Sequence, residues 1–292
     1  MNSKQNRDGQ RQMSRTFLSE IVARRRRTVA ELRATSTGGA LRSRAVETRK
    51  NAAPHRLCEA LNATSPALKI IAEFKRSSPS VGRIRDDLSP ADVAGRYERG
   101  GASAISVLTD EEYFNGSIED LSAVRTRTRL PVLRKDFIVD PIQIYEAAIA
   151  GADAILLIVA ALDDDSLGKL RRAAEDELGL DALIEVHTPD ELRRALNVGA
   201  RIVGVNNRDL QTFEVSLNTS ERLIAEALPG RLMLSESGLR DSEQLRYLRT
   251  LGFHGFLIGE ALMRAKDPET ALRDLLANAA DDDRQILSHE TS

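Results

Sequence analysis

The chain has 292 residues, 41% hydrophobic and 29% charged, which is the composition of a globular protein with a sizeable core. Its net charge of -2 hides an asymmetry, because residues 1–50 hold 13 Lys/Arg against 4 Asp/Glu. The longest apolar run, residues 154–162, is too short to span a bilayer, and the N-terminus lacks the apolar core of a signal peptide. We therefore expect a cytoplasmic protein with no membrane partner.

Cysteine and histidine are too few or too scattered for a disulfide or a metal centre. Cys58 is the single cysteine, and the four histidines show no metal-ligand spacing. The basic N-terminal region could contact nucleic acid, but no recognition motif accompanies it, and solvated helices give the same counts. We expect no cofactor, no metal and no nucleic-acid partner.

The first 66 residues predict a tail and then a helical extension. Residues 1–15 are polar, as a disordered tail would be. Residues 35–54 contain two adjacent glycines and a proline and are interpreted as a loop, and a short helix is predicted over residues 55–62. A longer helix is predicted over residues 16–33, because its apolar residues fall on one stripe, namely Leu18, Ile21, Val22, Val29 and Leu32.

Apolar segments alternate with helical segments over residues 67–279. Pro follows a capping residue at Ser89, Asp140 and Thr188, which indicates helix starts, and Gly-Ala pairs precede several of the apolar segments. Strands are predicted near residues 68–75, 102–109, 131–135, 152–158, 181–186, 201–206, 231–235 and 254–258.

Eight such units with continuously apolar strands predict an α/β fold, a single (β/α)8 TIM barrel behind the N-terminal helical extension. A doubly wound open sheet is the alternative. Residues 280–292 contain a run of three aspartates and are predicted to form a disordered C-terminal tail.

Charged residues end the first predicted strand. Glu73 and Lys75 are two positions apart, so both project from the same face of the strand. Such a pair could be an ordinary salt bridge. In a TIM barrel, however, functional groups lie at the carboxyl ends of the strands, and reactive side chains recur at the later strand ends.

Lys135 and Glu185 are the strongest individual candidates for catalytic residues. Lys135 follows an apolar strand and should reach into the mouth of the barrel, where burial and the nearby cation Lys75 would lower its pKa and suit it to act as a general acid. Glu185 lies between apolar neighbours, as a buried carboxylate would.

Two further groups of residues predict binding functions. Phe114 and Phe137 lie in strand-end loops and could be core residues or walls for an aromatic ring. Phosphate is commonly held after the last two strands of this fold. There, Ser237-Gly238 and Gly259-Glu260 could supply backbone N–H donors, with the Glu260 side chain turned outward. The glycines could equally serve only to permit tight turns.

Six ordered motifs together resemble the indole-3-glycerol phosphate synthase family, over residues 16–278. Val81 differs from the lysine that we expect in the family's first loop, and the basic segment 35–54 matches poorly. The motifs are IAEFKRSSPS (71–80), LTD with YFNGS (108–117), LRKDFIVD (133–140), VNNRDL (205–210), SESG (235–238) and IGEALMR (258–264).

The resemblance implies that 1-(2-carboxyphenylamino)-1-deoxyribulose 5-phosphate, a sugar phosphate, is closed to indole-3-glycerol phosphate in tryptophan biosynthesis with loss of carbon dioxide and water. It implies that Lys135 is the general acid, that Glu185 stabilises a cation or transfers a proton, and that Lys75 with Glu73 acts in binding and dehydration. It leaves open which carboxylate is the base.

The resemblance also implies binding roles. Asn206, among the catalytic residues, and Arg208 would orient the substrate, and Ser78 would contact it. The phosphate would be held by Ser237, Gly238, Gly259 and Glu260. An apolar slot for the aromatic ring would consist of Pro79, Phe114, Phe137 and Leu210.

Three other functions are open on the same residues. One is an aldolase in which Lys135 or Lys75 forms a Schiff base. A second is a phosphoribosyl isomerase, which we expect to need a strand-end cysteine, whereas Cys58 precedes the first strand. A third is an inactive sugar-phosphate binding scaffold, for which so many charged strand ends would be unnecessary. We expect a monomer or weak homodimer.

Overall fold

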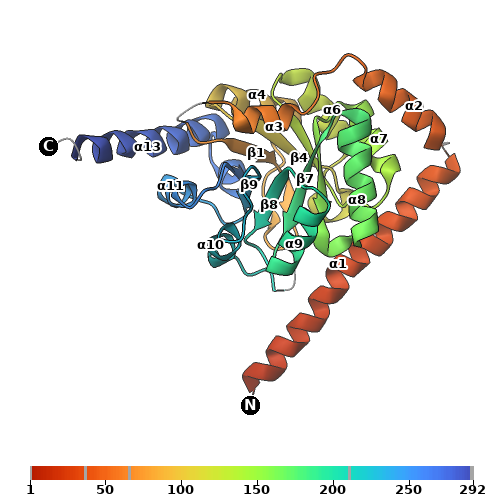
Figure 1. Ribbon diagram of the computed structural model, residues 1–292, viewed down its shortest axis with the longest axis horizontal. Helices are drawn as coiled ribbons and strands as arrows, with labels where there is room; N and C mark the ends of the chain where they lie inside the picture. The colour runs from red at the N-terminus through yellow and green to blue at the C-terminus, as the bar shows by residue number, and fades with distance from the viewer. Residues whose placement is uncertain (1, 36–37, 65–66, 210–211, 290–292) are drawn as a thin grey trace.

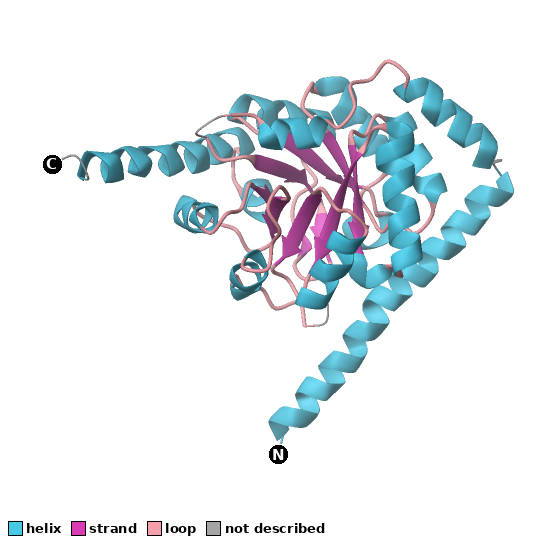
Figure 2. Ribbon diagram, in the orientation of Figure 1, coloured by secondary structure: helices cyan, strands magenta, loops and turns pink. Residues whose placement is uncertain are grey.

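The computed structural model describes residues 2–35, 38–64, 67–209 and 212–289. Eight of its strands are all parallel and close into a barrel in the order β1-β10-β9-β8-β7-β6-β5-β4, with helices around the outside (Figures 1 and 2). These strands are β1 (Ile70–Phe74), β4 (Ala104–Leu108), β5 (Val132–Lys135), β6 (Ala154–Ile158), β7 (Asp181–Val186), β8 (Ile202–Asn206), β9 (Leu232–Glu236) and β10 (Gly255–Ile258).

The predicted TIM barrel and all eight predicted strands are therefore confirmed. The helices on the outside are α4 (Pro90–Gly100), α5 (Glu111–Phe114), α6 (Ile118–Arg127), α7 (Pro141–Ala150), α8 (Asp164–Arg172), α9 (Pro189–Asn197), α10 (Asn218–Ile224), α11 (Ser242–Thr250), α12 (Glu260–Arg264) and α13 (Pro268–His289), with short helices η1 (Val159–Ala161) and η2 (Ala173–Glu177).

The helix boundaries follow the predicted caps. The side chains of Ser89, Asp140 and Thr188 accept hydrogen bonds from the backbone of α4, α7 and α9, each with Pro in the first turn. Gly101 and Gly151 end helices at φ of 93° and 94°, a conformation that costs glycine little.

Alternation along the strands sorts their residues between two cores. Odd-numbered residues of β1 and β5, such as Ile71 and Leu133, face the barrel interior, while their neighbours pack beneath the helices. Leu57 and Leu61 of α3 (Arg56–Asn62) belong to the interior cluster, so this predicted helix closes the amino-terminal end of the barrel. Further along the strands the inward-facing positions are taken by charged residues, which therefore lie at the carboxyl-terminal end of the barrel.

The N-terminal extension holds more helix than we predicted. The helix α1 (Asn2–Thr35) includes the predicted residues 16–33, with Ile21 and Val29 buried. The predicted loop at residues 35–54 is wrong, because α2 (Gly38–Arg49) occupies most of it and packs on α7 through the buried Ala45 (Figure 1). Its two glycines stand at the start of the helix, where they interrupt nothing, and good helix formers follow.

The two predicted tails are also described as helix. The helix α1 continues back to Asn2 and α13 continues to His289, and both extend beyond the barrel (Figure 1). Helical hydrogen bonds are local, so a polar segment continues a helix that its neighbour has already started. The division of the chain into tails, extension and barrel stays a prediction. None of the described helices has the length and apolar character needed to cross a membrane.

A small hairpin after β1 was not predicted. Strands β2 (Ser77–Ser78) and β3 (Gly82–Arg83) pair antiparallel, and Val81 lies in the turn between them. Two-residue strands give no periodic signal in a sequence, so this hairpin could be found only from the structure.

Candidate active site

A cavity of about 470 Å³ opens at the carboxyl-terminal end of the barrel. This volume lies within the range of small-molecule sites. Leu210 lies outside the described residues. Every other predicted site residue lines the cavity: Glu73, Lys75, Ser78, Pro79, Phe114, Lys135, Phe137, Glu185, Asn206, Arg208, Ser237, Gly238, Gly259 and Glu260.

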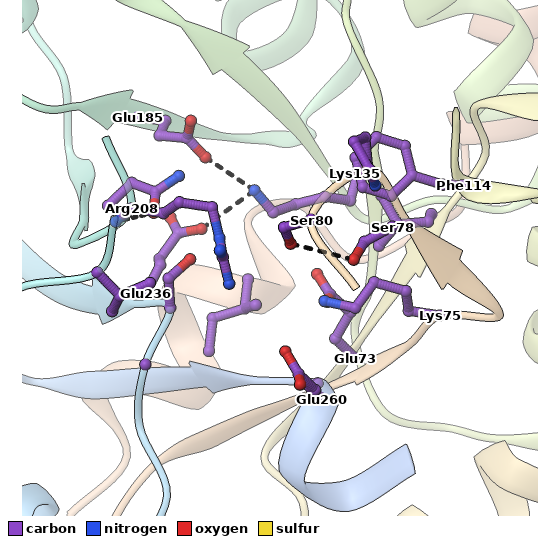
Figure 3. Close-up of a pocket in the computed structure, with 18 of the residues that line it drawn as sticks. Glu73, Lys75, Ser78, Ser80, Phe114, Lys135, Glu185, Arg208, Glu236 and Glu260 are labelled. Atoms are coloured by element: carbon purple, nitrogen blue, oxygen red, sulfur yellow. Dashed lines mark hydrogen bonds and ion pairs between the residues drawn. The ribbon is translucent and has the colours of Figure 1, made fainter. Parts of the chain in front are cut away.

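Lys135 is held between two buried carboxylates. Its Nζ lies 2.8 Å from Glu185 Oε2 and 3.1 Å from Glu236 Oε2 (Figure 3). The three residues continue the inward-facing positions of β5, β7 and β9, so closure of the barrel brings them together.

The expected pKa shift of Lys135 is wrong in direction. Burial lowers the pKa of this ammonium group, but the charges of Glu185, Glu236 and Glu73 outweigh burial and raise it. Carboxylates on three strands, rather than the cation Lys75, dominate its surroundings, and their placement depends on barrel closure. Lys135 therefore carries its proton throughout the physiological pH range.

Glu236 is the residue of this cluster that we did not predict. Burial, together with repulsion from Glu185, raises its pKa to about 7 against the attraction of Lys135. Like Glu73 and Glu185, Glu236 is a carboxylate at the end of a buried strand, but Ser235 and Ser237 flank it, so the apolar neighbours that marked Glu185 are absent. From the sequence we named Glu236 only as part of the SESG motif and predicted no role for it.

Glu185 is stabilised as an anion by several neighbours. Its burial raises the pKa, but Lys135, His187 and a hydrogen bond from Asn206 reverse that effect and lower it. His187 Nε2 lies 3.6 Å from Glu185 Oε1, and its Nδ1 lies 3.2 Å from Glu191 Oε2. Burial lowers the pKa of His187, but these carboxylates raise it overall.

The first strand supplies a second cation–carboxylate pair. Lys75 Nζ lies 2.7 Å from Glu73 Oε1, as their shared strand face predicts. Figure 3 shows Lys75 beside Glu73 and apart from Lys135. The cavity therefore offers two ammonium groups at different places.

Aromatic rings form one wall. The rings of Phe114 and Phe137 have their centroids 6.4 Å apart, and both line the cavity with Pro79. Phe17 of α1 adds a residue that we did not predict, and its ring packs edge-on against Tyr113 and Phe213. Its partners are almost 100 and 200 residues away, so no local pattern indicated this contact.

The far end of the cavity combines tight turns with cations. Ser237 and Gly238 follow β9 with φ of 67° and 77°. Glu260 lies at the edge of the cavity (Figure 3) rather than turned away from it, and Arg264 Nε donates to its carboxylate at 3.0 Å. This exposed ion pair offsets part of the negative charge of Glu260.

Ion pairs fasten α1 to the rim of the barrel. Arg25 contacts the buried carboxylates of Asp110 at 2.9 Å and Asp136 at 2.6 Å, and Arg24 also pairs with Asp110. Asp136 is shared with Arg134, which points away from the barrel interior. Part of the basic excess of the N-terminal region is therefore used to cover the mouth of the barrel.

No group of three or more His, Cys, Asp or Glu side chains within the described ranges has the arrangement of a metal site.

Comparison with known proteins shows the family to which the chain is similar. A family model for indole-3-glycerol phosphate synthase matches residues 18–275. An indole-3-glycerol phosphate synthase of Carboxydothermus hydrogenoformans is 47% identical over 89% of this chain and 100% of its own length. That of Syntrophobacter fumaroxidans is 44% identical over 89% of this chain and 97% of its own.

Solved structures share the fold at low sequence identity. A thiamine phosphate pyrophosphorylase from Pyrococcus furiosus superposes with a TM-score of 0.56 and 18% identity over 74% of this chain and 96% of its own. A mandelate oxidase mutant with benzaldehyde gives a TM-score of 0.57 and 16% identity over 85% of both chains. These likenesses concern the barrel alone.

Proposed function

The chain belongs to the indole-3-glycerol phosphate synthase family, and from this premise we propose how its residues close an indole ring. It is an indole-3-glycerol phosphate synthase, a carboxy-lyase of tryptophan biosynthesis, and its substrate is a sugar phosphate. The substrate of the proposed reaction is 1-(2-carboxyphenylamino)-1-deoxyribulose 5-phosphate. The observation that carries the mechanism is the placement of Lys135 Nζ between the carboxylates of Glu185 and Glu236.

Lys135 is the proposed acid of ring closure. The ring carbon that bears the carboxylate attacks the ketone carbon, a carbon–carbon bond forms, and the ketone oxygen takes a proton from the Lys135 ammonium group. The raised pKa of Lys135 means that the group enters the reaction in its protonated form. The same raised pKa disfavours the Schiff-base alternative, because a nucleophilic lysine must be neutral.

Carboxylates stabilise the charge and accept the proton in the steps after ring closure. Ring closure leaves positive charge on the aromatic system, which Glu185 stabilises because its lowered pKa keeps it ionised. The bond to the carboxylate then breaks, carbon dioxide leaves, and the electron pair returns to the ring. No external oxidant or reductant is needed.

Dehydration needs a second acid and a base. Lys75 protonates the hydroxyl, which leaves as water, and Glu73 holds the Lys75 ammonium group in place at 2.7 Å. The adjacent carbon loses a proton to a carboxylate, a task for which Glu236 is suited because its pKa of about 7 lies near neutral pH.

The two ends of the substrate fit the two ends of the cavity. Phe114, Phe137 and Pro79 line a slot for the aromatic ring. The turn at Ser237 and Gly238, with Gly259 and the backbone of Glu260, faces the phosphate. Arg208 Nη1 donates to Phe213 O at 3.1 Å, which holds its guanidinium group where it orients the substrate (Figure 3).

The proposal predicts that Lys135→Ala lowers kcat by at least about 10³-fold, because the ketone oxygen loses its proton donor. The measurement is fluorescence of the indole product on addition of the carboxyphenylamino substrate, with circular dichroism to establish folding. Lys75→Ala serves as the comparison and should weaken binding and the later step. Near-full activity of a folded Lys135→Ala protein contradicts the assignment, and a lysine adduct trapped by borohydride would favour the aldolase.

We also propose that the enzyme is a monomer or a weak homodimer. The large apolar side chains exposed in the described residues lie in different segments of the chain, whereas a stable dimer buries a large apolar interface. They are Val46, Val215, Leu228 and Tyr247.

A further inference from the structure

Gly204 is a glycine whose presence the backbone does not explain. It lies in the middle of β8, in a fully buried strand, where glycine weakens a sheet because it has no side chain to pack. Its φ does not fall in the left-handed region that favours glycine. A close approach by another group is the usual reason for a glycine at such a position.

The approaching group is the carboxylate of Glu236. A Cβ atom at Gly204 would lie 2.0 Å from Glu236 Oε1 and 3.1 Å from Leu183 Cδ1. Glu236 pairs with Asn206 in the β8–β9 register, whereas Gly204 pairs with Leu234. The Glu236 side chain therefore bends back over Gly204, toward the barrel interior, and there its Oε2 meets Lys135 Nζ at 3.1 Å.

The same arrangement occurs at a second carboxylate of the cluster. A Cβ atom at Gly259, which follows β10, would lie 2.3 Å from Oε1 of Glu73 on the neighbouring strand β1. Two carboxylates near Lys135 thus each occupy the space of a missing side chain on the adjacent strand. The repetition argues that these glycines serve the carboxylates and not the sheet.

We propose that Gly204 is a positioning residue of the reaction, because its missing side chain is the space in which Glu236 reaches Lys135. The inference rests on the proposed roles of Lys135 and Glu236. An alanine methyl group at position 204 displaces the end of the Glu236 side chain, which is flexible, and leaves the backbone conformation allowed. The main loss is then the ion pair and not the barrel.

Displacing Glu236 changes the charges around Lys135. The groups that face Glu236 are Lys135 from β5, Glu185 from β7, Glu73 from β1 and His187 beyond β7. Lys135 would keep its burial and lose one of its carboxylates. Its proton would then dissociate at lower pH, which moves the alkaline limb of the kcat profile to lower pH.

The experiment compares kcat, KM and pH profiles of indole-3-glycerol phosphate formation in four proteins: wild type, Gly204→Ala, Glu236→Ala and the double variant. Glu236→Ala should lower kcat by about 10²-fold. Gly204→Ala should lower kcat by about tenfold or more, leave KM within about twofold and shift the alkaline limb. The double variant should match Glu236→Ala, because truncation of Glu236 removes the atom that the new methyl group meets.

Each alternative outcome has one meaning. Unchanged kcat in Gly204→Ala, or the same fold-loss on the Glu236→Ala background, overturns the inference. Unchanged activity in Glu236→Ala instead overturns the proposed role of Glu236. If Gly204→Ala does not fold, a folded double variant supports the close approach, and an unfolded double variant contradicts it.

Gly255→Ala is the matched control. Gly255 is a buried strand glycine whose Cβ would lie 3.0 Å from Leu234 Cδ2, with no carboxylate among its near neighbours. The Gly255→Ala substitution should lower the free energy of unfolding and leave both kcat and the pH profile unchanged. A shifted pH limb in this variant would show that strand strain alone produces the effect and would overturn the inference.

Discussion

The residues around Lys135 form a series of alternating charges, and each fixes the protonation of the next. Glu191 contacts His187, His187 lies beside Glu185, and Glu185 and Glu236 both contact Lys135. Because all are largely buried, their interactions are weakly screened by solvent. A change at His187, which does not itself line the cavity, is therefore transmitted to the reacting groups through Glu185.

The raised pKa of His187 predicts a pH-dependent contribution to stability. Its folded-state pKa exceeds the unfolded value of about 6.5, so the contribution is complete below about pH 6.5 and disappears as the pH rises through the folded-state value. His187→Asn should therefore lower the free energy of unfolding more at pH 5.5 than at pH 9. Urea denaturation across this range measures the difference.

His254 provides a control of opposite sign. Burial lowers its pKa, so this histidine destabilises the fold as the pH falls and it must take up a proton. Replacement by Asn should therefore become less costly at low pH, whereas the cost of His187→Asn increases. A cost of His187→Asn that does not change with pH would contradict the assignment of charge to its imidazole.

At the scale of elements, α1 acts as part of the cavity wall. Phe17, Leu18 and Ile21 line the cavity, and one turn further on Arg25 contacts two carboxylates that follow β4 and β5. The ion pairs and the aromatic contact both fasten the helix to strand-end loops. The position of Phe17 over the substrate slot therefore depends on Arg25.

Arg25→Ala should lower both stability and substrate affinity. Removing this cation leaves Asp110 and Asp136 buried without one of their partners, at a cost of about 3 kcal/mol. The looser helix should raise KM more than it lowers kcat. Urea denaturation and steady-state kinetics measure the two effects. Arg27→Ala changes an exposed arginine of the same helix and should alter neither; equal effects of both substitutions would refute the argument.

At the scale of the whole molecule, the large apolar residues exposed in different segments of the chain predict a single chain in solution. Sedimentation equilibrium at micromolar concentration should give a mass near 32.1 kDa. A weak homodimer would appear only at higher concentration. A stable dimer at low micromolar concentration would contradict the proposal, because it requires a large apolar interface.

The sequence predicted the barrel well and its electrostatics poorly. Buried parallel strands are continuous apolar runs, and the charged residues that end them stand out, which is why Glu73, Lys135 and Glu185 were found. The pKa of Lys135 could not be found in this way, because it depends on carboxylates 50 and 101 residues further on. Contacts between residues so far apart in the sequence exist only after the barrel has closed.

Predictions also failed where local rules gave the wrong signal. The glycines at positions 38 and 39 suggested a loop, but the packing of Ala45 against α7 decides that segment. Glu236 was missed because two serines flank it, whereas Glu185 lies between apolar residues. Gly259 was considered only for phosphate, since its contact with Glu73 joins strands from opposite ends of the chain.

The pairing of β1 with β10 has a consequence for synthesis on the ribosome. Ile70 of β1 pairs with Phe256, so the first strand emerges with one edge unpaired and keeps it until nearly the whole chain has been translated. During that interval α1 has already emerged, while Asp110 and Asp136, which anchor it, appear later. The nascent chain therefore contains an open sheet and a helix that has not yet packed on it. The last strand completes both the barrel and the binding site.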